Sequence, residues 1–537
     1  MKRSNFKIYF LTLASVIGLT SCTNLEIDET DSIISEGFQG LADPSSTVDN
    51  LYNNLGGAFS TQENLYALSE VTSDAALVPT RGTDWGDNGR WRVLHQHAWN
   101  NEQLFIVNTW NQWNAFQLNA SQILDERSSP SAQNIGDASF VRAYSVWVIL
   151  DLYGQVPFRD VSLPSSALPE VLTGQAAVDQ ILSDVDVAIA NLPATTGGSG
   201  EANGKGSKAA ARYLKAKILL NKHIYVGGEP QPGDMAEVVS LVDAITADGY
   251  ALEADYFGIF RDTPDTESIL HLRADVGTRI WNGLHYNSTT IEGGGWNGFS
   301  TLAEYYDLFE GDPAANNITV NDGTPLSNQE LRRGGVPLDG TPFTGVAGTT
   351  DEGGFENGSN VGFGFLIGQQ YGLTGNALQD RAGAPLTFKK EFQDGAGATS
   401  FINNDETTGI RVIKYHPKYG GRLQHMVIFR YSDALLMKAE AILRGASGDA
   451  AAVVNEIRVI RGVSPLGTVD LPTLLDERGR ELFAEGWRRN DLIRFGEYGR
   501  DWLFKESSSI NNPTWNLFPI PGPQLLANPN LVQNPGY

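Results

Sequence analysis

The chain has 537 residues, 41% of them hydrophobic and 19% charged, a composition typical of a folded globular protein with one large core or two to three ordinary ones. Aspartate and glutamate total 63 against 39 lysines and arginines, which gives a formal net charge of −24. A surface with this charge repels nucleic acid and other polyanions and favours neutral or cationic partners, so we expect no nucleic-acid partner.

Residues 1–21 have the pattern of a secretory signal peptide. Three basic residues precede an apolar stretch, 8–19, that is too short to span a bilayer comfortably. The stretch leads into LTSC, which resembles the lipobox of bacterial lipoproteins, so we expect Cys22 to become the lipidated first residue of the mature protein. Ordinary signal cleavage beside a chance cysteine is the alternative. Cys22 is the only cysteine, which excludes internal disulfides and CxxC metal sites, and residues 22–42 are expected to be a tether.

Helical periodicity dominates the part of the chain that follows the tether. Val48, Leu51, Leu55 and Phe59 recur at intervals of three and four residues, which predicts a helix over residues 47–62. The same kind of pattern predicts five more helices, over residues 101–126, 137–153, 174–191, 207–225 and 234–248.

The middle of the chain, residues 293–408, has a different composition. Glycine, asparagine, aspartate and threonine dominate it, and only short pieces at 384–392 and 410–415 alternate like strands. An irregular stretch of this length in a compact protein is usually functional surface carried on a regular frame.

Helical periodicity returns over residues 430–494 as three helices in succession. In the third helix, Asp476 and Arg480 lie four residues apart, as do Glu485 and Arg489, which predicts a solvated helix face. The proline-rich C-terminal segment is too apolar to be a free tail, so we expect it to pack along the body. No clean 34-residue repeat is present, so any helical repeats are degenerate.

Several blocks of sequence, in the same order, point to a known family. Residues 140–158 read FVRAYSVWVILDLYGQVPF, similar to an LRA…DLYG.VP helix. Residues 429–443, 474–494 and 517–537 resemble the C-terminal blocks of the same proteins, including the FPIP and NPN…QNPGY elements. Together with the lipobox, these blocks resemble the SusD/RagB family of Bacteroidetes outer-membrane lipoproteins.

The resemblance implies a mainly α-helical fold, in which degenerate tetratricopeptide-like helix pairs support an irregular, loop-rich half. Residues 43–537 then form a single SusD-like domain, with a helical frame at 43–280 and 425–505 and a loop-rich insertion at about 281–424. Members of the family bind glycans at the cell surface, are not enzymes, and cover a TonB-dependent transporter of the SusC type. We therefore expect an outer-membrane protein that faces the cell exterior, touches the membrane through its lipid anchor alone, and passes oligosaccharide or polysaccharide to such a transporter.

Sugar rings bind to flat apolar side chains, and tryptophan offers a large surface of this kind. Trp85 lies in the polar loop TRGTDWGDNGR, and Trp281 and Trp296, with Tyr286 between them, flank a run of three glycines that can present a neighbouring aromatic ring. In SusD-like proteins the glycan site likewise draws loop aromatics from these two regions, so we expect these four residues to contact glycan. The tryptophans on helical patterns are expected in the core or frame: Trp110, Trp113, Trp147, Trp487 and Trp502.

Asp74, Arg81 and Arg381 are the expected hydrogen-bonding partners for sugar hydroxyls, with structural ion pairs as the alternative for the arginines. The negative net charge favours a neutral glycan, and β-glucans such as laminarin or fructans are the expected ligands. Two other classes stay open. A surface glycoside hydrolase is one, because folding can bring two of the 63 carboxylates together, and a non-catalytic scaffold protein on helical repeats is the other.

No cofactor is expected. His95 and His97 are spaced to ligate a metal from a strand, but no third ligand of matching spacing is visible. Residues 312–322 are oxygen-rich enough for calcium but lack the order of an EF-hand loop, so calcium is the weaker alternative.

Overall fold

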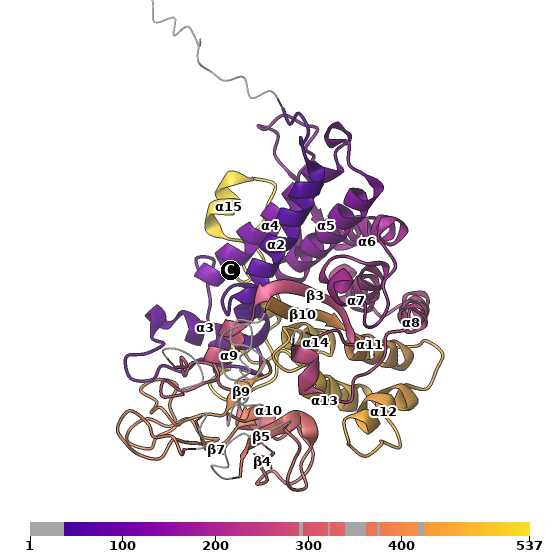
Figure 1. Ribbon diagram of the computed structural model, residues 1–537. Coiled ribbons are helices and arrows are strands. Elements are labelled where there is room, and N and C mark those ends of the chain that lie inside the picture. Colours follow the sequence, from indigo (N-terminus) through magenta and orange to yellow (C-terminus); the bar gives the residue numbers. More distant parts are fainter. Residues whose placement is uncertain are drawn as a thin grey trace, which may run out of the picture.

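The computed structural model describes residues 37–261, 263–288, 294–319, 323–338, 361–372, 376–416 and 424–537. The predicted signal peptide, the predicted lipidation site Cys22 and most of the predicted tether lie outside these residues. Helices fill one side of the molecule, and the short strands and loops of the middle segment gather at one end of it (Figure 1). Within the described ranges, no helix combines the length and the apolar character needed to cross a membrane.

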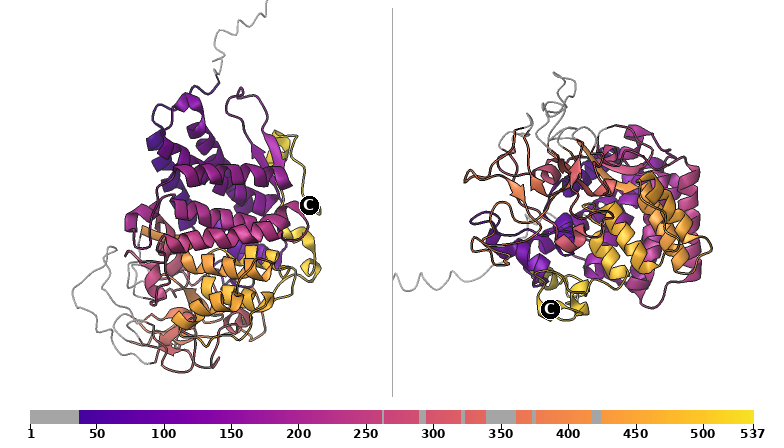
Figure 2. Two further views of the ribbon diagram at one scale, coloured as in Figure 1. Left: turned by 90° about the vertical axis from the view of Figure 1, so that its right-hand side faces the viewer. Right: turned by 90° about the horizontal axis from the view of Figure 1, so that it is seen from below.

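The first block of the chain is helical where periodicity predicted helices. Its longer elements are α2 (Pro44–Ser60), α3 (Arg90–Gln96), α4 (Leu104–Leu124), α5 (Ala132–Tyr153), α6 (Gly174–Asn191), α7 (Lys208–Val226) and α8 (Pro232–Ala247), with a π-helical turn η1 (Ala67–Val71) after α2. Each helix from α5 to α8 packs against the one before it, which produces stacked antiparallel pairs (Figure 2). The prediction of a mainly α-helical frame is confirmed.

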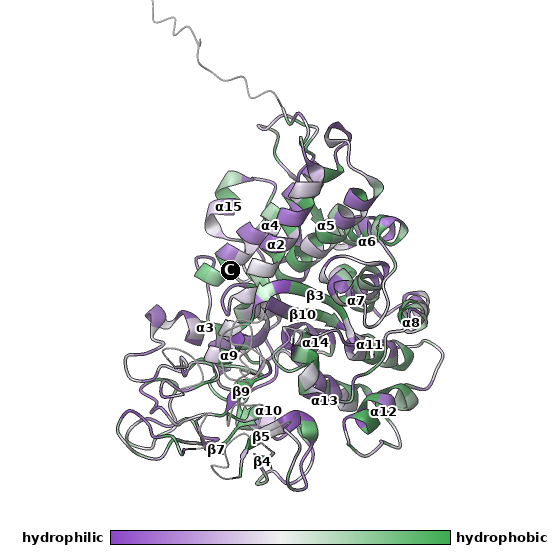
Figure 3. Ribbon diagram, viewed as in Figure 1, coloured by the Kyte–Doolittle hydropathy of each residue, from purple (hydrophilic) through white to green (hydrophobic). Residues whose placement is uncertain are grey.

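Local sequence explains where helix α5 begins and ends. The Ser131 side chain accepts a hydrogen bond from the Asn134 backbone N–H, and the Asn134 side chain accepts one from the Ser131 backbone N–H, which forms a capping box. The helix ends at Gly154, whose φ of 72° is a left-handed conformation that glycine adopts without strain. Hydrophobic and hydrophilic residues alternate along the helices of the stack (Figure 3), because each helix turns one face to its neighbours.

Most of the C-terminal helices extend the same stack. They are α11 (Tyr431–Leu443), α12 (Ala450–Ile460), α13 (Leu471–Leu482) and α14 (Arg488–Arg494). The short α15 (Gly522–Ala527) lies apart from them, beside α4 (Figure 1). Helix α11 packs against α8, so the N-terminal and C-terminal blocks form one continuous frame. The third predicted helix is in fact two helices, because the chain turns between α13 and α14, where Ala484 has a positive φ of 58°.

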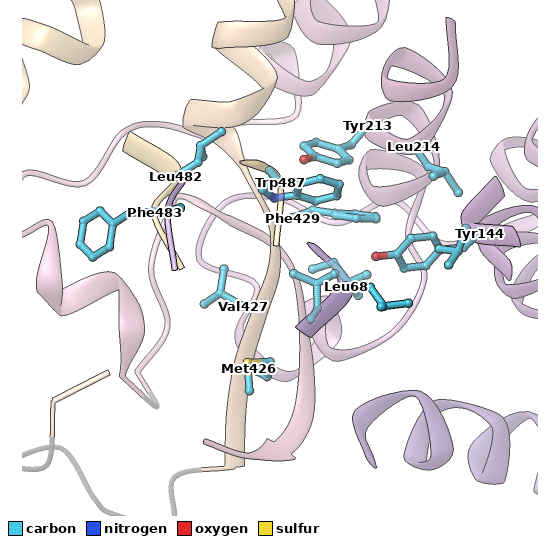
Figure 4. Packing of buried hydrophobic residues seen from close by; sticks show 14 of the residues in the cluster. Leu68, Tyr144, Tyr213, Leu214, Met426, Val427, Phe429, Leu482, Phe483 and Trp487 are labelled. Atoms are coloured by element: carbon cyan, nitrogen blue, oxygen red, sulfur yellow. The ribbon is translucent and has the colours of Figure 1, made fainter. Parts of the chain in front are cut away.

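A long two-stranded ribbon, absent from the sequence predictions, runs through the centre of the frame. Strand β3 (Ser268–Asp275) pairs antiparallel with β10 (Gln424–Arg430), which joins the two ends of the loop-rich segment. Phe429 of β10 lies fully buried, with its ring stacked on Tyr213 at 4.2 Å between centroids and with Tyr144 and Trp487 beside it (Figure 4). Strand β10 therefore carries part of the main hydrophobic core.

The loop-rich segment holds only short elements. They are α9 (Gly277–Trp281), α10 (Ala303–Tyr306), a four-stranded sheet in the order β4 (Asn317–Ile318), β5 (Gly334–Pro337), β6 (Phe363–Leu366) and β9 (Arg411–Ile413), and the pair β7 (Gly368–Gln369) and β8 (Thr387–Phe388). A second small ribbon, β1 (Gln155–Phe158) and β2 (Glu170–Thr173), lies between α5 and α6. The expected strand pieces near residues 384–392 and 410–415 correspond to β8 and β9.

A buried network of ion pairs ties the loop-rich segment to the C-terminal helices. Glu481 of α13 accepts hydrogen bonds from Arg332, Arg430 and Arg461 at 2.9, 2.7 and 2.9 Å. All four side chains are inaccessible to solvent or nearly so. Because a buried charge is costly without a partner, each of these residues depends on the others for its place in the core.

The expectation of a solvated face on the third C-terminal helix is therefore wrong. Arg480 is mostly buried and bonds to Glu477 on the same helix at 2.7 Å, and Glu485 bonds to Arg430 at 2.8 Å. Arg489 is also buried and pairs with Asp151 of α5. Glu485 and Arg489 find partners on other segments, and Arg480 pairs within its own helix three residues away and not four.

The C-terminal segment packs along the body, as expected. Phe518 and Ile520 are fully buried, and the Phe518 backbone N–H donates to Leu152 of α5 at 2.8 Å. The final residue, Tyr537, accepts a hydrogen bond from the indole of Trp99 at 2.8 Å.

Candidate functional site

Two loops that are distant in sequence lie side by side at the loop-rich end. The backbones of Leu77 and Ser300 exchange two hydrogen bonds of 2.9 Å, which aligns the Trp85 loop with the segment that contains Trp296. The indole N–H of Trp85 donates to the backbone carbonyl of Trp296 at 2.8 Å. The Trp85 ring also covers Gly298, where a Cβ atom would lie 2.3 Å from the ring, so only glycine allows this close approach.

The second pair of aromatic rings comes from α9 and the segment after it. Trp281 ends α9, and its carbonyl accepts the backbone N–H of Trp296 at 2.7 Å. The two rings lie 5.1 Å apart between centroids at an angle of 58°. Gly294, with a φ of 72°, makes the turn that brings Trp296 back to α9. Trp85, Trp281 and Trp296 are all half-buried, so each keeps part of its surface accessible.

A polar group that contains Arg381 lies beside these rings. The Arg381 guanidinium stacks over the ring of Tyr286 at 4.2 Å and pairs with Asp84 at 3.0 Å. The Tyr286 hydroxyl donates to the same Asp84 carboxylate at 2.9 Å. On its other side, Arg381 is paired with Glu406, which also bonds to His285 at 3.0 Å. About half of the Arg381 side chain, 51%, is exposed and accessible to a ligand.

The electrostatics of this group follow from its burial and its pairing. Burial lowers the pKa of His285 to about 4, so the imidazole is neutral at pH 7. Burial alone would raise the pKa of Glu406, but Arg381 and His285 hold it below its ordinary value. Two carboxylates, Asp84 and Glu406, therefore surround one guanidinium, and the group carries a net negative charge.

Four of the residues expected to contact glycan, Trp85, Trp281, Trp296 and Tyr286, thus lie together with Arg381. Sequence reasoning missed Asp84, His285 and Glu406. The first two are the chain neighbours of Trp85 and Tyr286, so their position beside these aromatics was an available signal. Glu406 carried no local signal, because folding alone brings it to Arg381.

Asp74 and Arg81 do not belong to this accessible group, and their expected role is corrected. Asp74 is fully buried and pairs with Arg488 at 2.7 Å and with Arg500. Arg81 is 1% exposed, and its guanidinium bonds to backbone carbonyls and hydroxyls inside the protein, including Asn297 O at 2.8 Å. A ligand on the surface cannot reach either side chain.

The remaining predictions about sites concern the core tryptophans and metals. The tryptophans expected in the core or frame are buried: Trp110, Trp113, Trp147, Trp487 and Trp502. His95 and His97 are also buried, and their ring nitrogens contact backbone carbonyls of Ala76, Leu503 and Thr72.

No cluster of three or more histidine, cysteine or acidic side chains arranged for a metal occurs in the described part of the chain. The candidate calcium segment, 312–322, lies partly outside the described residues. In its described part, the side-chain amide of Asn316 donates to the Ile367 carbonyl at 2.5 Å, and the Asp312 carboxylate accepts the Ala314 N–H at 2.9 Å.

Comparison with known proteins gives consistent matches. The SusD family profile matches residues 266–537. The starch-binding protein SusD of Bacteroides thetaiotaomicron is 25% identical over 429 residues, which cover 74% of this chain and 72% of that protein. The SusD-like protein P25 of Formosa agariphila is 23% identical over 467 residues and covers 81% of this chain and 80% of that protein.

Solved structures share the fold over nearly the whole chain. A laminarin-binding SusD-like protein superposes with a TM-score of 0.63 at 20% identity, covering 93% of this chain and 100% of that chain. Surface glycan-binding protein A from Bacteroides thetaiotaomicron, in complex with laminarihexaose, superposes with a TM-score of 0.61 at 18% identity, covering 91% and 98%.

Proposed function

This chain belongs to the SusD family, and from that membership we propose that it is a cell-surface protein that binds oligosaccharide or polysaccharide without cleaving it. The observation that carries the proposal is the gathering of Trp85, Trp281, Trp296 and Tyr286 with Arg381 at the loop-rich end. Residues 43–537 are proposed to form the single ligand-binding domain.

The geometry suits the two requirements of sugar recognition. The C–H faces of sugar rings pack on accessible indole surface, which the three half-buried tryptophans supply. Hydroxyl groups need fixed donors and acceptors, and Arg381, Asp84 and Glu406 already hold one another in place before a ligand arrives. Such preorganisation lowers the entropic cost of binding.

The proposed ligand is a neutral glycan. The accessible Arg381 guanidinium is already paired with Asp84 and Glu406, so a uronic acid or a sulfated sugar would have to compete with two carboxylates for it. The names of two structural relatives refer to laminarin and laminarihexaose, which supports a β-glucan. A fructan is the second neutral candidate.

The proposed absence of catalysis rests on the state of the carboxylates. A glycoside hydrolase needs one carboxylic acid whose pKa is raised so that it can protonate the leaving oxygen. Glu406 has the opposite property, because Arg381 and His285 hold its pKa below the ordinary value. The Asp84 carboxylate accepts hydrogen bonds from Arg381 and from the Tyr286 hydroxyl.

The proposal includes the anchor and the partner. A lipid chain on Cys22 would hold the protein at the outer membrane, facing the exterior, and a TonB-dependent transporter of the SusC type would receive the bound glycan. Each stacked ring contributes about 1 kcal/mol beyond its area burial, so a site of this size binds in the millimolar to micromolar range. Anchoring raises the local concentration and makes such affinities sufficient.

Titration calorimetry of the soluble protein against neutral and charged polysaccharides tests the proposal. We expect laminarin or a fructan to bind, alginate and sulfated glycans to fail, and Trp85→Ala and Trp296→Ala to weaken binding about fivefold to tenfold each. Trp515→Ala is the matched control, because Trp515 is also half-buried but packs against Trp99 and Tyr537. Release of reducing sugar over time would refute the binding-only function. Co-purification with a large outer-membrane barrel would support a transporter partner, whereas purification alone would favour a stand-alone scaffold.

A further inference from the structure

Two buried arginines lie beneath the candidate site. Arg81 and Arg411 are 1% and 0% exposed, and both donate to the hydroxyl of Ser300, at 2.9 and 3.1 Å, and to the carbonyl of Thr408, at 2.8 and 2.6 Å. Because they share two acceptors, the two guanidinium groups act on the same pieces of backbone.

The shared target on the aromatic side is Asn297, the residue after Trp296. Arg81 donates from Nε to the Asn297 backbone carbonyl at 2.8 Å, and Arg411 donates from Nε to the Asn297 side-chain oxygen at 2.8 Å. Asn297 has a positive φ of 51°, a left-handed conformation that asparagine adopts more readily than most residues. The backbone carbonyl that receives the Trp85 indole bond belongs to the residue directly before this one.

The shared target on the polar side is the loop that carries Glu406. Arg411 donates to the Glu406 backbone carbonyl at 2.8 Å, and Arg81 donates to that of Asp405 at 3.0 Å. The Asn297 side-chain amide also donates to the Glu406 carbonyl, at 3.1 Å. The Glu406 side chain in turn holds Arg381 and His285.

Arg81 joins a third loop through its own backbone. Its N–H and carbonyl exchange hydrogen bonds of 3.0 and 2.9 Å with Asp84, which makes the tight turn directly before Trp85. One residue therefore connects the loop that carries Asp84 and Trp85 to the two loops that carry Trp296 and Glu406.

Burying Arg81 and Arg411 side by side costs electrostatic free energy, so the hydrogen bonds that they make must compensate for it. In the described part of the chain, both guanidinium groups bond to neutral acceptors, namely backbone carbonyls, an amide oxygen and hydroxyls. Burial lowers the pKa of Arg81 to about 10. The pKa of Arg411 is also lowered, by burial and by the nearby positive charge of Arg81. Two like charges buried together destabilise the fold unless their hydrogen bonds compensate, whereas apolar side chains would fill the space without that cost.

We propose that Arg81 and Arg411 are positioning residues for the candidate glycan site, which hold the loops of Trp85, Trp296 and Glu406 in mutual register. The role depends on the planar fork of the guanidinium, because one side chain donates in several fixed directions at once. A lysine keeps the charge but donates from a single nitrogen, so it cannot span the three loops. The inference rests on the proposed function only in the experiment that measures glycan affinity.

The test compares Arg81→Lys and Arg411→Lys with Arg333→Lys in the full chain. Arg333 is a matched control, because it is also fully buried and also bonds to backbone carbonyls, those of Asp312 and Ala315, but in another loop. Ser300→Ala is a milder variant that removes one shared acceptor and leaves both charges in place, so it serves if a lysine variant fails to fold.

Two readouts separate positioning from general stability. The first is hydrogen exchange of the Trp85 indole N–H, which reports its bond to the Trp296 carbonyl. The second is affinity for the neutral glycan that the wild-type protein binds best. We expect indole exchange to accelerate at least tenfold and affinity to fall at least tenfold in Arg81→Lys and Arg411→Lys, with smaller changes of the same sign in Ser300→Ala. Arg333→Lys should lose stability without either effect.

The inference is overturned if the Arg81 and Arg411 variants match Arg333→Lys in indole exchange at equal loss of stability. If the wild-type protein binds none of the glycans tested, the proposed function fails, but the indole measurement still decides whether these arginines hold the loops in place.

Discussion

Glu477 of α13 offers a sharp test of the buried ion network. Its carboxylate is inaccessible to solvent and bonds to Arg332 at 2.8 Å, Arg458 at 2.8 Å and Arg480 at 2.7 Å. Burial alone would raise its pKa, but the three guanidinium groups lower it from 4.5 to about 2. Glu477→Gln keeps the shape of the side chain and removes the charge, so three buried arginines lose a shared partner.

Two separate estimates of the stability lost in Glu477→Gln agree. Each unit of pKa shift corresponds to about 1.4 kcal/mol, so a shift from 4.5 to about 2 is worth about 3 kcal/mol at pH 7. Breaking a buried ion pair by removal of one partner costs about 3–5 kcal/mol. Because the folded pKa of Glu477 lies below the unfolded one, this stability is present above pH 4.5 and is lost as the pH falls towards 2.

Urea unfolding at several pH values measures the effect. We expect Glu477→Gln to be less stable than the wild type by about 3 kcal/mol at pH 7, with a gap that closes as the pH falls below about 4. Asp49→Asn is the control, because its pair with Lys205 is exposed and should contribute nothing measurable. A gap that is small at pH 7, or that stays constant with pH, would refute the account of the network.

Three further outcomes are expected. Gly298→Ala should displace the Trp85 ring, since the new Cβ would lie 2.3 Å from it. We expect weaker glycan binding and a shift of the tryptophan fluorescence to the red, with no change in secondary structure by circular dichroism. Arg381→Ala should weaken glycan binding about tenfold in calorimetry and change the melting temperature little, because half of the Arg381 side chain is exposed to solvent. Burial lowers the pKa of His95 from 6.5 to about 4, so as the pH falls the unfolded chain binds a proton before the folded protein does. The free energy of unfolding should therefore fall as the pH drops from 6.5 to 4. In urea unfolding over that range, His95→Gln should lose about 3 kcal/mol less than the wild type does.

Helices could be predicted from the sequence because their pattern is local. An apolar residue every three or four positions marks one face of a helix wherever it packs, and the prediction over 174–191 coincides with α6 (Gly174–Asn191). The same argument placed Trp110, Trp113 and Trp147 in the core, where they are buried. Strand β10 escaped prediction because it is buried on most of its length and shows no alternation of polar and apolar residues. Residues 270–275 of strand β3 do alternate, with the apolar ones buried, so its pattern was available in the sequence and was missed.

The sequence by itself determined the helical frame, the family and the two loops whose aromatic residues meet at the candidate site. Only the tertiary structure decided which charged side chains are accessible. Arg81 stands in the Trp85 loop and Asp74 lies shortly before it, yet partners from segments more than 200 residues away enclose them. Arg381 meets Asp84 across almost 300 residues, pairs with Glu406 as well, and stays about half exposed. Burial of a charge depends on which distant segment supplies its partner, and local spacing along the chain carries no information about that.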